Sequence, residues 1–136
     1  MPSPKLTNSL SIVLPAKNEA GAVGSTVARI RALYPEADVL VVNDGSSDDT
    51  AELAQAAGAK VITHPYSQGN GSAIKTGARA ARGEIIVFMD ADGQHDPADI
   101  PRLLAKLEDG YDMVVGARQQ GSQASVGRGL ANRFYN

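Results

Sequence analysis

The sequence has no cysteine and no long apolar run, and each absence removes a class of protein. Without cysteine, disulfides and thiolate metal sites are excluded, and a reducing, cytoplasmic compartment is suited. No apolar run approaches the roughly 18 residues that a membrane-spanning helix needs, and residues 1–5 lack the apolar stretch of a signal peptide. The net charge of −2 gives no field that favours nucleic acid or a membrane surface. A soluble chain is expected.

The 136 residues are 43% hydrophobic, which suffices for a single domain with its own core. We expect that core at about residues 9–118, followed at 119–136 by a loop and the start of a further segment. Charge is spread unevenly, because no acidic residue follows Asp112 whereas Arg118, Arg128 and Arg133 do. Such a basic end is either a solvated tail or a surface for phosphate groups.

Strand and helix patterns alternate along the chain. Short apolar runs that read as buried strands lie at 11–14 (ended by Pro15), 39–42, 61–63, 85–89 and 113–115. Apolar strands separated by helices predict an α/β fold with a mainly parallel sheet covered on both faces. Ligands of such sheets bind beyond the carboxyl ends of the strands, so the loops that follow the strands are the expected site.

Four stretches show the apolar spacing of helices. The first runs from Val23 to Tyr34 and is closed by Pro35. Asp49 and Glu52 have the spacing of a capping box that opens a second helix, which Gly58 stops. The last two stripes consist of Ile74, Gly77, Ala78 and Ala81 before Gly83, and of Ile100, Leu103, Leu104 and Leu107 before Gly110.

The strongest chemical signal is an acidic turn directly after the most apolar strand, Asp90-Ala91-Asp92-Gly93-Gln94-His95-Asp96. Two carboxylates two residues apart at the mouth of a strand can share one divalent cation, and hard oxygen ligands suit Mg²⁺ or Mn²⁺. Gln94 can add a carbonyl oxygen or hold a coordinated water. The alternative is an ordinary turn, since Asp and Gly are common turn residues. For Asp96, before Pro97, a helix cap is the leading interpretation.

A second polar segment follows the second strand, Asn43-Asp44-Gly45-Ser46-Ser47-Asp48-Asp49-Thr50. A carboxylate at the carboxyl end of a strand can accept a hydrogen bond from a base N–H or a ribose hydroxyl. Asp48 and Asp49 fit local helix capping. Asp44 lies too early for capping, so it is the better candidate for binding, with a plain glycine turn as the alternative.

Weaker signals follow the first and third strands. Pro15-Ala16-Lys17-Asn18-Glu19 brings polar side chains to the same edge, with capping as the alternative for Asn18. Gln68-Gly69-Asn70-Gly71-Ser72, followed by Lys75, places glycines at a helix start, where they permit close phosphate approach or make an ordinary turn. His64 is expected to have a surface or turn role. His95 has no serine nucleophile to pair with, so no catalytic triad is predicted.

In this order and spacing, the four motifs resemble those of family 2 glycosyltransferases, most closely the branch of dolichyl-phosphate mannose synthase and bacterial polyprenyl-phosphate glycosyltransferases. The resemblance covers roughly residues 9–118 and implies the GT-A fold, a nucleotide-binding α/β sandwich. It implies metal-assisted, inverting transfer from a UDP- or GDP-sugar to an acceptor, with a polyprenyl phosphate favoured. Because family catalytic domains are longer, we expect a truncated chain, whose parent protein could lie at the inner face of the membrane.

The resemblance also assigns residues. Asp90 and Asp92 match the Asp-x-Asp metal motif, and Gln94 is a further ligand of the Mg²⁺ or Mn²⁺ ion. Asp92 and Arg118 are the implied catalytic residues, with Arg118 facing the diphosphate or the acceptor phosphate. The implied nucleotide-sugar-binding residues are Pro15, Ala16, Asn18, Glu19, Asp44, Gly71, Lys75, Asp90, Ala91 and Asp92.

The sequence departs from the family at two positions and leaves other classes open. Asn43 stands where the family usually has aspartate, and Lys17 where it often has tyrosine. A fragment that binds a nucleotide and turns over nothing is the main alternative. A haloacid dehalogenase-type phosphatase is remote, because its Asp-x-Asp motif normally follows the first strand. The glycine patterns of dinucleotide-binding and P-loop proteins are absent.

Overall fold

A computed structural model describes residues 10–93, 96–102 and 114–115. Its elements are β1 (Leu10–Ala16), α2 (Val23–Leu33), β2 (Asp38–Asn43), α3 (Thr50–Ala56), β3 (Lys60–Thr63), α4 (Asn70–Ala80), β4 (Ile85–Phe88), the 3-10 helix η1 (Pro97–Asp99) and β5 (Val114–Val115). These strands pair in parallel in the order β3-β2-β1-β4-β5. The predicted parallel α/β sheet is therefore confirmed, and the order reverses between β1 and β4, which is the topological switch point.

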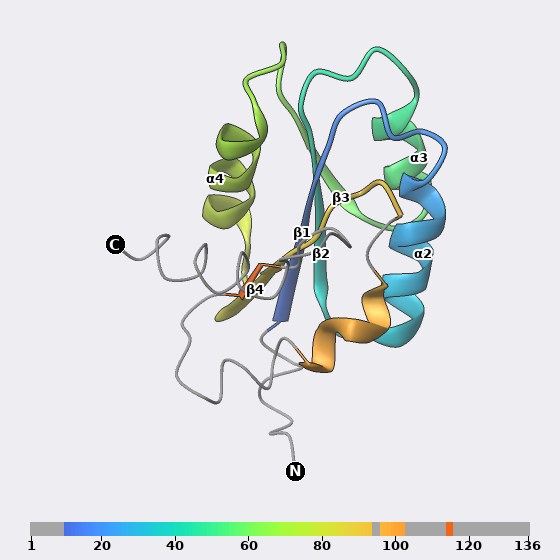
Figure 1. Ribbon diagram of the computed structural model, residues 1–136, viewed down its shortest axis with the longest axis vertical. Helices are drawn as coiled ribbons and strands as arrows, with labels where there is room; N and C mark the ends of the chain where they lie inside the picture. Colours follow the sequence, from blue (N-terminus) through green and yellow to red (C-terminus); the bar gives the residue numbers. More distant parts are fainter. Residues whose placement is uncertain (1–9, 94–95, 103–113, 116–136) are drawn as a thin grey trace, which may run out of the picture.

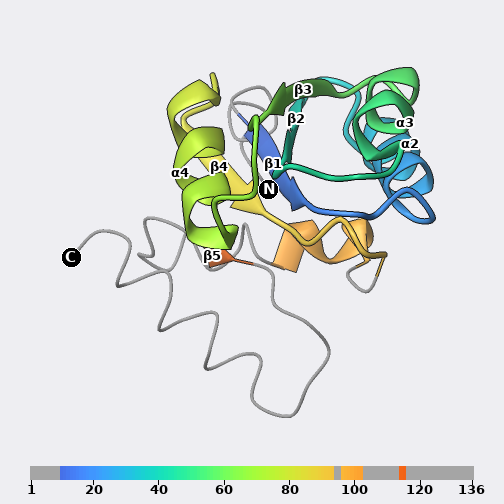
Figure 2. The ribbon, with the colours of Figure 1, turned by 90° about the horizontal axis from the view of Figure 1, so that it is seen from above.

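Helices cover both faces of the sheet (Figure 1). Figure 2 shows α2 and α3 together on one face and α4 on the other. Successive strand residues point to opposite faces. The cluster under α2 and α3 includes Ile12, Leu14, Val39 and Val41, and the cluster under α4 includes Val13, Leu40 and Val42. Because both faces are buried, the strands read as continuous apolar runs rather than as alternating ones.

Strand β1 runs two residues beyond its predicted end, through Pro15 to Ala16. The prediction that Pro15 ends the strand is wrong. Backbone groups of a parallel strand point alternately to its two neighbours. The carbonyl of Val13 accepts from Met89 on the β4 side, and that of Ala16 accepts from Asp44 on the β2 side. The missing N–H of Pro15 thus faces β4, whose pairing with β1 ends at Val13, so proline costs no ladder bond here.

At the starts of α3 and η1, the predicted cap at Asp49 is wrong and the predicted cap at Asp96 is confirmed. Asp49 is the N-cap of α3, but its side chain makes no cap hydrogen bond. Its ψ of 22 departs from the extended geometry that lets an N-cap side chain reach back. Asp48 does this instead, accepting from the backbone N–H of Thr50 at 3.0 Å. Asp96 has ψ 119 and caps η1 as predicted, accepting from the N–H of Ala98.

Helix α4 packs closely on the strands through the predicted small-residue stripe. A Cβ at Gly77 would lie 2.3 Å from Cγ1 of Val13, so only glycine fits there. Residues 100–102 are helical and Ile100 is buried, while the rest of the last predicted stripe and the basic end lie outside the described residues. Among the helices of the described part, none is long and apolar enough to cross a membrane.

Candidate functional site

The loops that follow β1, β2 and β3 lie together at the carboxyl edge of the sheet, at the top of Figure 1. Asn18, at φ 56, joins the first two loops: its N–H donates to Oγ of Ser46, and its Oδ1 accepts from the N–H of Ser47, both at 2.8 Å. The N–H of Glu19 donates to Oγ1 of Thr50 at 2.9 Å. The side chain of Asn18 therefore bridges two loops and does not cap a helix.

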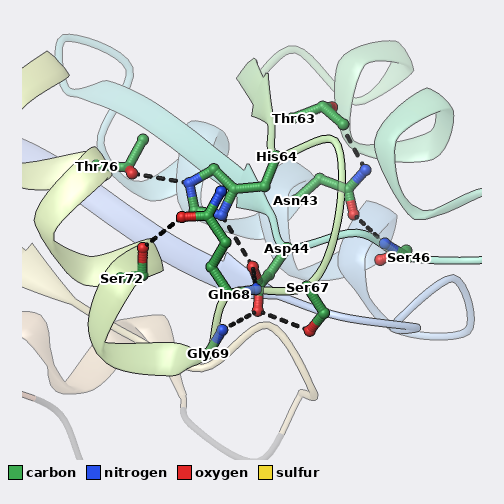
Figure 3. A network of polar contacts seen from close by, with 10 residues as sticks. All are labelled: Asn43, Asp44, Ser46, Thr63, His64, Ser67, Gln68, Gly69, Ser72 and Thr76. Atoms are coloured by element: carbon green, nitrogen blue, oxygen red, sulfur yellow. Dashed lines mark hydrogen bonds and ion pairs between the residues drawn. The ribbon is translucent and has the colours of Figure 1, made fainter.

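Asp44 follows β2 and binds the loop after β3 (Figure 3). Its Oδ1 accepts from Nδ1 of His64 at 2.9 Å and from the N–H of Gln68 at 2.8 Å. Its Oδ2 accepts from the N–H of Gly69 at 2.9 Å and from the hydroxyl of Ser67 at 3.2 Å. A carboxylate offers about four acceptor positions, so these contacts occupy them.

The environment of Asp44 fixes its charge. Burial raises its pKa, but hydrogen bonds from the N–H of Gln68, from His64, from the N–H of Gly69 and from Ser67 outweigh that effect and lower the pKa to about 2. The carboxyl group is therefore ionised at neutral pH. Since a carboxylate only accepts hydrogen bonds, Nδ1 of His64 carries the proton of this pair.

His64 is buried, with 7% of its surface exposed, so the predicted surface role is wrong. Its second ring nitrogen, Nε2, lies 2.8 Å from Oγ1 of Thr76 on α4. Both nitrogens have partners, which removes the cost of burying the ring. Those partners lie 20 and 12 residues away in sequence, so no local pattern indicates them.

A pocket of about 270 Å³ opens beside Asp44. Its lining consists of Pro15, Ala16, Lys17, Asp44, Ser67, Gly69, Asn70 and Ala73. Small-molecule sites usually measure roughly 300–1,000 Å³, so this pocket lies just below the usual range. Pro15, Ala16 and Asp44 were predicted as site residues. Lys17, Ser67, Gly69, Asn70 and Ala73 were not, although the glycine-rich signal marked the segment that contains Gly69 and Asn70.

The other described residues that were predicted do not line this pocket. Asn18 and Glu19 belong to the loop after β1, where they bind the loop after β2. Gly71 and Lys75 lie on α4, and a Cβ at Gly71 would meet nothing within 4 Å. Gln94, His95 and Arg118 lie outside the described residues.

The acidic turn leaves the end of β4 and is anchored by Ala91, the residue between its first two aspartates. Ala91 is 1% exposed and belongs to the core cluster under α2. Asp90 and Asp92, on either side of it, are partly exposed. Gly93 turns the chain at φ 82, and a Cβ there would lie 3.5 Å from that of Ala22, just before α2. Packing of Ala91 thus anchors the turn that carries both aspartates at the end of β4.

The pair Asp90 and Asp92 fits the donor set of Mg²⁺ or Mn²⁺. Magnesium is commonly held by one or two carboxylates, with waters and substrate phosphates as the remaining ligands. Within 10–93, 96–102 and 114–115, no group of three or more acidic, histidine or cysteine side chains could hold a metal by itself. Two carboxylates suit a Mg²⁺ or Mn²⁺ ion whose remaining ligands are waters or a phosphate.

Strand order sets the spacing between the two halves of this edge. β1 lies between β2 and β4, so Asp44 and the acidic turn are separated by two strand spacings, roughly 10 Å. The loop after β1 lies between them, at the switch point where ligands of open α/β sheets bind. The pocket is thus on the β2 side and the acidic pair on the β4 side of one edge.

Comparisons with known proteins agree with this architecture. The model of the family described as glycosyl transferase family 2 matches residues 11–136, and the chain belongs to this family. An uncharacterised glycosyltransferase of Mycobacterium tuberculosis is 40% identical over 112 residues, covering 82% of this chain and 50% of the relative. An undecaprenyl-phosphate 4-deoxy-4-formamido-L-arabinose transferase of Klebsiella pneumoniae is 37% identical over 137 residues, covering 93% and 42%. The chain spans half or less of these relatives.

Solved structures share the fold. Glucosyl-3-phosphoglycerate synthase of M. tuberculosis, in complex with Mg²⁺ and uridine diphosphate, has a TM-score of 0.64 and 34% identity over 73% of this chain and 39% of that one. The same enzyme with Mn²⁺, UDP-glucose and phosphoglyceric acid has a TM-score of 0.65 and 34% identity, covering 75% and 40%. The predicted α/β sandwich of GT-A type is therefore confirmed, and the phosphatase alternative has no support.

Proposed function

We propose that this chain forms the nucleotide-sugar side of a glycosyltransferase that moves a sugar from a nucleoside diphosphate sugar to an acceptor. The observation that carries the proposal is the carboxyl edge of the sheet at the switch point. It combines a pocket beside Asp44 with a pair of carboxylates, Asp90 and Asp92, about two strand spacings away, roughly 10 Å. That separation suits a nucleoside at one end and its diphosphate at the other.

The pocket side takes the nucleoside in this proposal. Pro15 and Ala16 give it an apolar wall, and Lys17 and Asp44 give it polar groups of opposite charge. Complexes of the M. tuberculosis synthase with uridine diphosphate and UDP-glucose support a UDP-sugar. A GDP-sugar is the competing donor, and a nucleotide screen separates the two.

The acidic turn takes the diphosphate together with Mg²⁺ or Mn²⁺. Asp90 and Asp92 would hold the ion, with Gln94 as a further ligand. A bound divalent ion supplies positive charge that stabilises a diphosphate leaving group. The buried Ala91 keeps the two carboxylates in place before substrate arrives, and the structural relatives with Mg²⁺ or Mn²⁺ support the metal.

The acceptor that we propose is a polyprenyl phosphate. The K. pneumoniae relative is an undecaprenyl-phosphate sugar transferase. A phosphate acceptor is already anionic, so inverting single displacement on it needs no strong general base, whereas a hydroxyl acceptor does. Arg118 would face this phosphate, and the parent protein would work at the inner face of the membrane.

One competing function follows from the coverage of the relatives, half or less of their length. The chain alone could bind the nucleotide sugar without transferring it. Incubating the chain with UDP-sugars, Mn²⁺ and a polyprenyl phosphate, followed by product analysis, distinguishes transfer from binding alone.

Thermal-shift screening of UDP, GDP and their sugars, with and without Mn²⁺, tests the proposal directly. We expect one nucleotide to raise the melting temperature only with the metal. Asp92→Ala should abolish that metal-dependent binding in calorimetry. Glu36→Ala is the control, because it removes an exposed carboxylate from the turn before β2. Unchanged nucleotide affinity in Asp92→Ala would contradict the proposal.

A further inference from the structure

We propose that His64 is a positioning residue of the nucleotide site: through Asp44, it holds residues 67–69 where they line the pocket. The inference rests on the proposed function, because it takes this pocket as the nucleotide site. It concerns how the pocket is built and assigns His64 no contact with the nucleotide.

Residues 67–69 are joined to α4 by two contacts, Ser72 Oγ to the side chain of Gln68 and the N–H of Ala73 to the carbonyl of Gly69, but the contacts that hold them to the end of β2 converge on Asp44. They have no regular secondary structure, yet the N–H groups of Gln68 and Gly69 and the hydroxyl of Ser67 all donate to this one carboxylate. Ser67 and Gly69 also line the pocket. The orientation of the Asp44 side chain therefore decides where this wall of the pocket lies.

Close packing sets the same segment directly on the turn after β2. A Cβ at Gly45 would lie 2.6 Å from the backbone nitrogen of Ser67, at a φ of +71. Backbone cannot retreat as a flexible side chain can, so the turn and the segment fit in one arrangement. Rotation of the Asp44 carboxylate would break its hydrogen bonds to residues 67–69, and the close packing leaves this segment no second position in which to form them.

His64 fixes the orientation of the Asp44 side chain through a hydrogen bond of its own. Its Nδ1 donates to Oδ1 of Asp44, and its Nε2 contacts Thr76 of α4. Helix α4 is itself held on β1 by the close approach of Gly77 to Val13. The imidazole thus connects the carboxylate to Thr76 of α4 (Figure 3), and two other residues of this helix, Asn70 and Ala73, line the pocket.

A neighbouring pair of residues provides a control from the same strand ends. One position earlier, Nδ2 of Asn43 donates to Oγ1 of Thr63 at 3.4 Å, also joining the end of β2 to the end of β3. Neither residue lines the pocket. A purely structural role for polar contacts between these strands predicts similar effects at both pairs, whereas positioning predicts an effect only at His64.

Two amide substitutions separate the functions of the ring nitrogens. The amide nitrogen of asparagine lies about where Nδ1 lies, and that of glutamine about where Nε2 lies. His64→Asn should therefore keep the donation to Asp44, and His64→Gln should lose it. Thr63→Val is the matched control, and Thr76→Val is the milder variant should His64→Gln fail to fold.

The experiment measures amide hydrogen exchange of Gln68 and Gly69 in each variant of the 136-residue chain, and the affinity for uridine diphosphate with Mn²⁺. Losing one hydrogen bond to a charged group changes an equilibrium constant, here that of local opening or of nucleotide binding, by about tenfold or more. We expect His64→Gln to speed exchange at both amides and to weaken nucleotide binding by that factor. Thr63→Val should stay within about twofold of the wild type, and His64→Asn and Thr76→Val, which lose only the contact between residue 64 and α4, should show a smaller shift in the same direction as His64→Gln.

The outcomes separate this inference from the proposed function. Unchanged exchange at Gln68 and Gly69 in His64→Gln and Thr76→Val would overturn the positioning role, whatever the nucleotide affinity. Equal losses in His64→Gln and Thr63→Val would overturn it in favour of a general structural role. If the wild type binds no uridine or guanosine nucleotide while exchange still rises in His64→Gln, the proposed function fails and the link from His64 to a nucleotide fails with it.

Discussion

Strand β2 has a carboxylate at each end, and the two have different partners. Asp38 begins the strand: its Oδ2 accepts from the hydroxyl of Ser11 and the N–H of Arg82, both at 3.0 Å, and its Oδ1 lies 3.2 Å from Nζ of Lys60. Asp44 follows the strand and binds the loop after β3. For both, burial raises the pKa, but hydrogen bonds outweigh it and lower the pKa.

The difference lies in what else holds those partners. Ser11 and Lys60 belong to strands that the sheet already fixes, and Arg82 follows the C-cap residue of α4. The partners of Asp44 at residues 67–69 have no ladder of their own. The same chemical group therefore adds to an existing structure at the amino edge, while at the carboxyl edge it creates the structure that lines a pocket.

Removing each charge tests this difference most strongly. Asp44→Asn replaces one acceptor by an amide that faces donors, so we expect a loss of roughly 1.5–3 kcal/mol in the free energy of unfolding, the usual contribution of a hydrogen bond to a charged group. Asp38→Asn should cost about 1 kcal/mol, because its Lys60 partner is solvent-exposed. Urea denaturation measures both, and an equal or larger loss in Asp38→Asn would remove the distinction.

A pair of glycines with positive φ extends the comparison to the backbone. A Cβ at Gly45 would meet the backbone of Ser67 at 2.6 Å, whereas one at Gly58 would meet the flexible side chain of Arg31 at 2.7 Å. Replacing either glycine by alanine should lower the free energy of unfolding by about 1–2 kcal/mol, because alanine is strained at a positive φ. Gly45→Ala should cost a further 1–3 kcal/mol or so from overpacking. Equal melting temperatures of the two variants would show that the loop has room to move.

Acid pH should lower the stability of the fold by protonating Asp44. Its pKa of about 2 in the folded chain lies below the usual value near 3.9 for an unfolded Asp. The resulting stability is present above about pH 4 and is lost as pH falls toward 2, on the order of 2 kcal/mol. Asp44→Asn should lack this contribution, so the wild type and the variant should converge in stability between about pH 4 and 2. A constant difference over that range would contradict the assignment.

Much of the fold follows from the sequence because the strands are buried on both faces. Residues 39–42 and 85–88 are all apolar, so they can be predicted as strands buried on both faces from their composition and short length alone. The end of β1 was mispredicted at Pro15, because a proline is tolerated or not according to which neighbouring strand its nitrogen faces. That depends on the sheet order, which is not a local property.

The site divides in the same way. Asp44 could be predicted because it lies too early to cap α3 and directly follows a strand. His64 could not, because its partners, Asp44 and Thr76, meet only when β2, β3 and α4 are assembled. Asp49 and Glu52 show the opposite case: the spacing of a capping box is present, but the backbone at Asp49 does not let the side chain reach the helix start.

Nucleotide binding by the variants of Asp38 and Asp44, at the two ends of β2, tests the account most directly. Calorimetry with uridine diphosphate and Mn²⁺, at a temperature where circular dichroism shows both variants folded, compares Asp44→Asn with Asp38→Asn. We predict a Kd about tenfold or more weaker for Asp44→Asn and within about twofold of the wild type for Asp38→Asn. Equal affinities of the two variants would contradict the claim that the carboxylate at the carboxyl edge builds the nucleotide pocket.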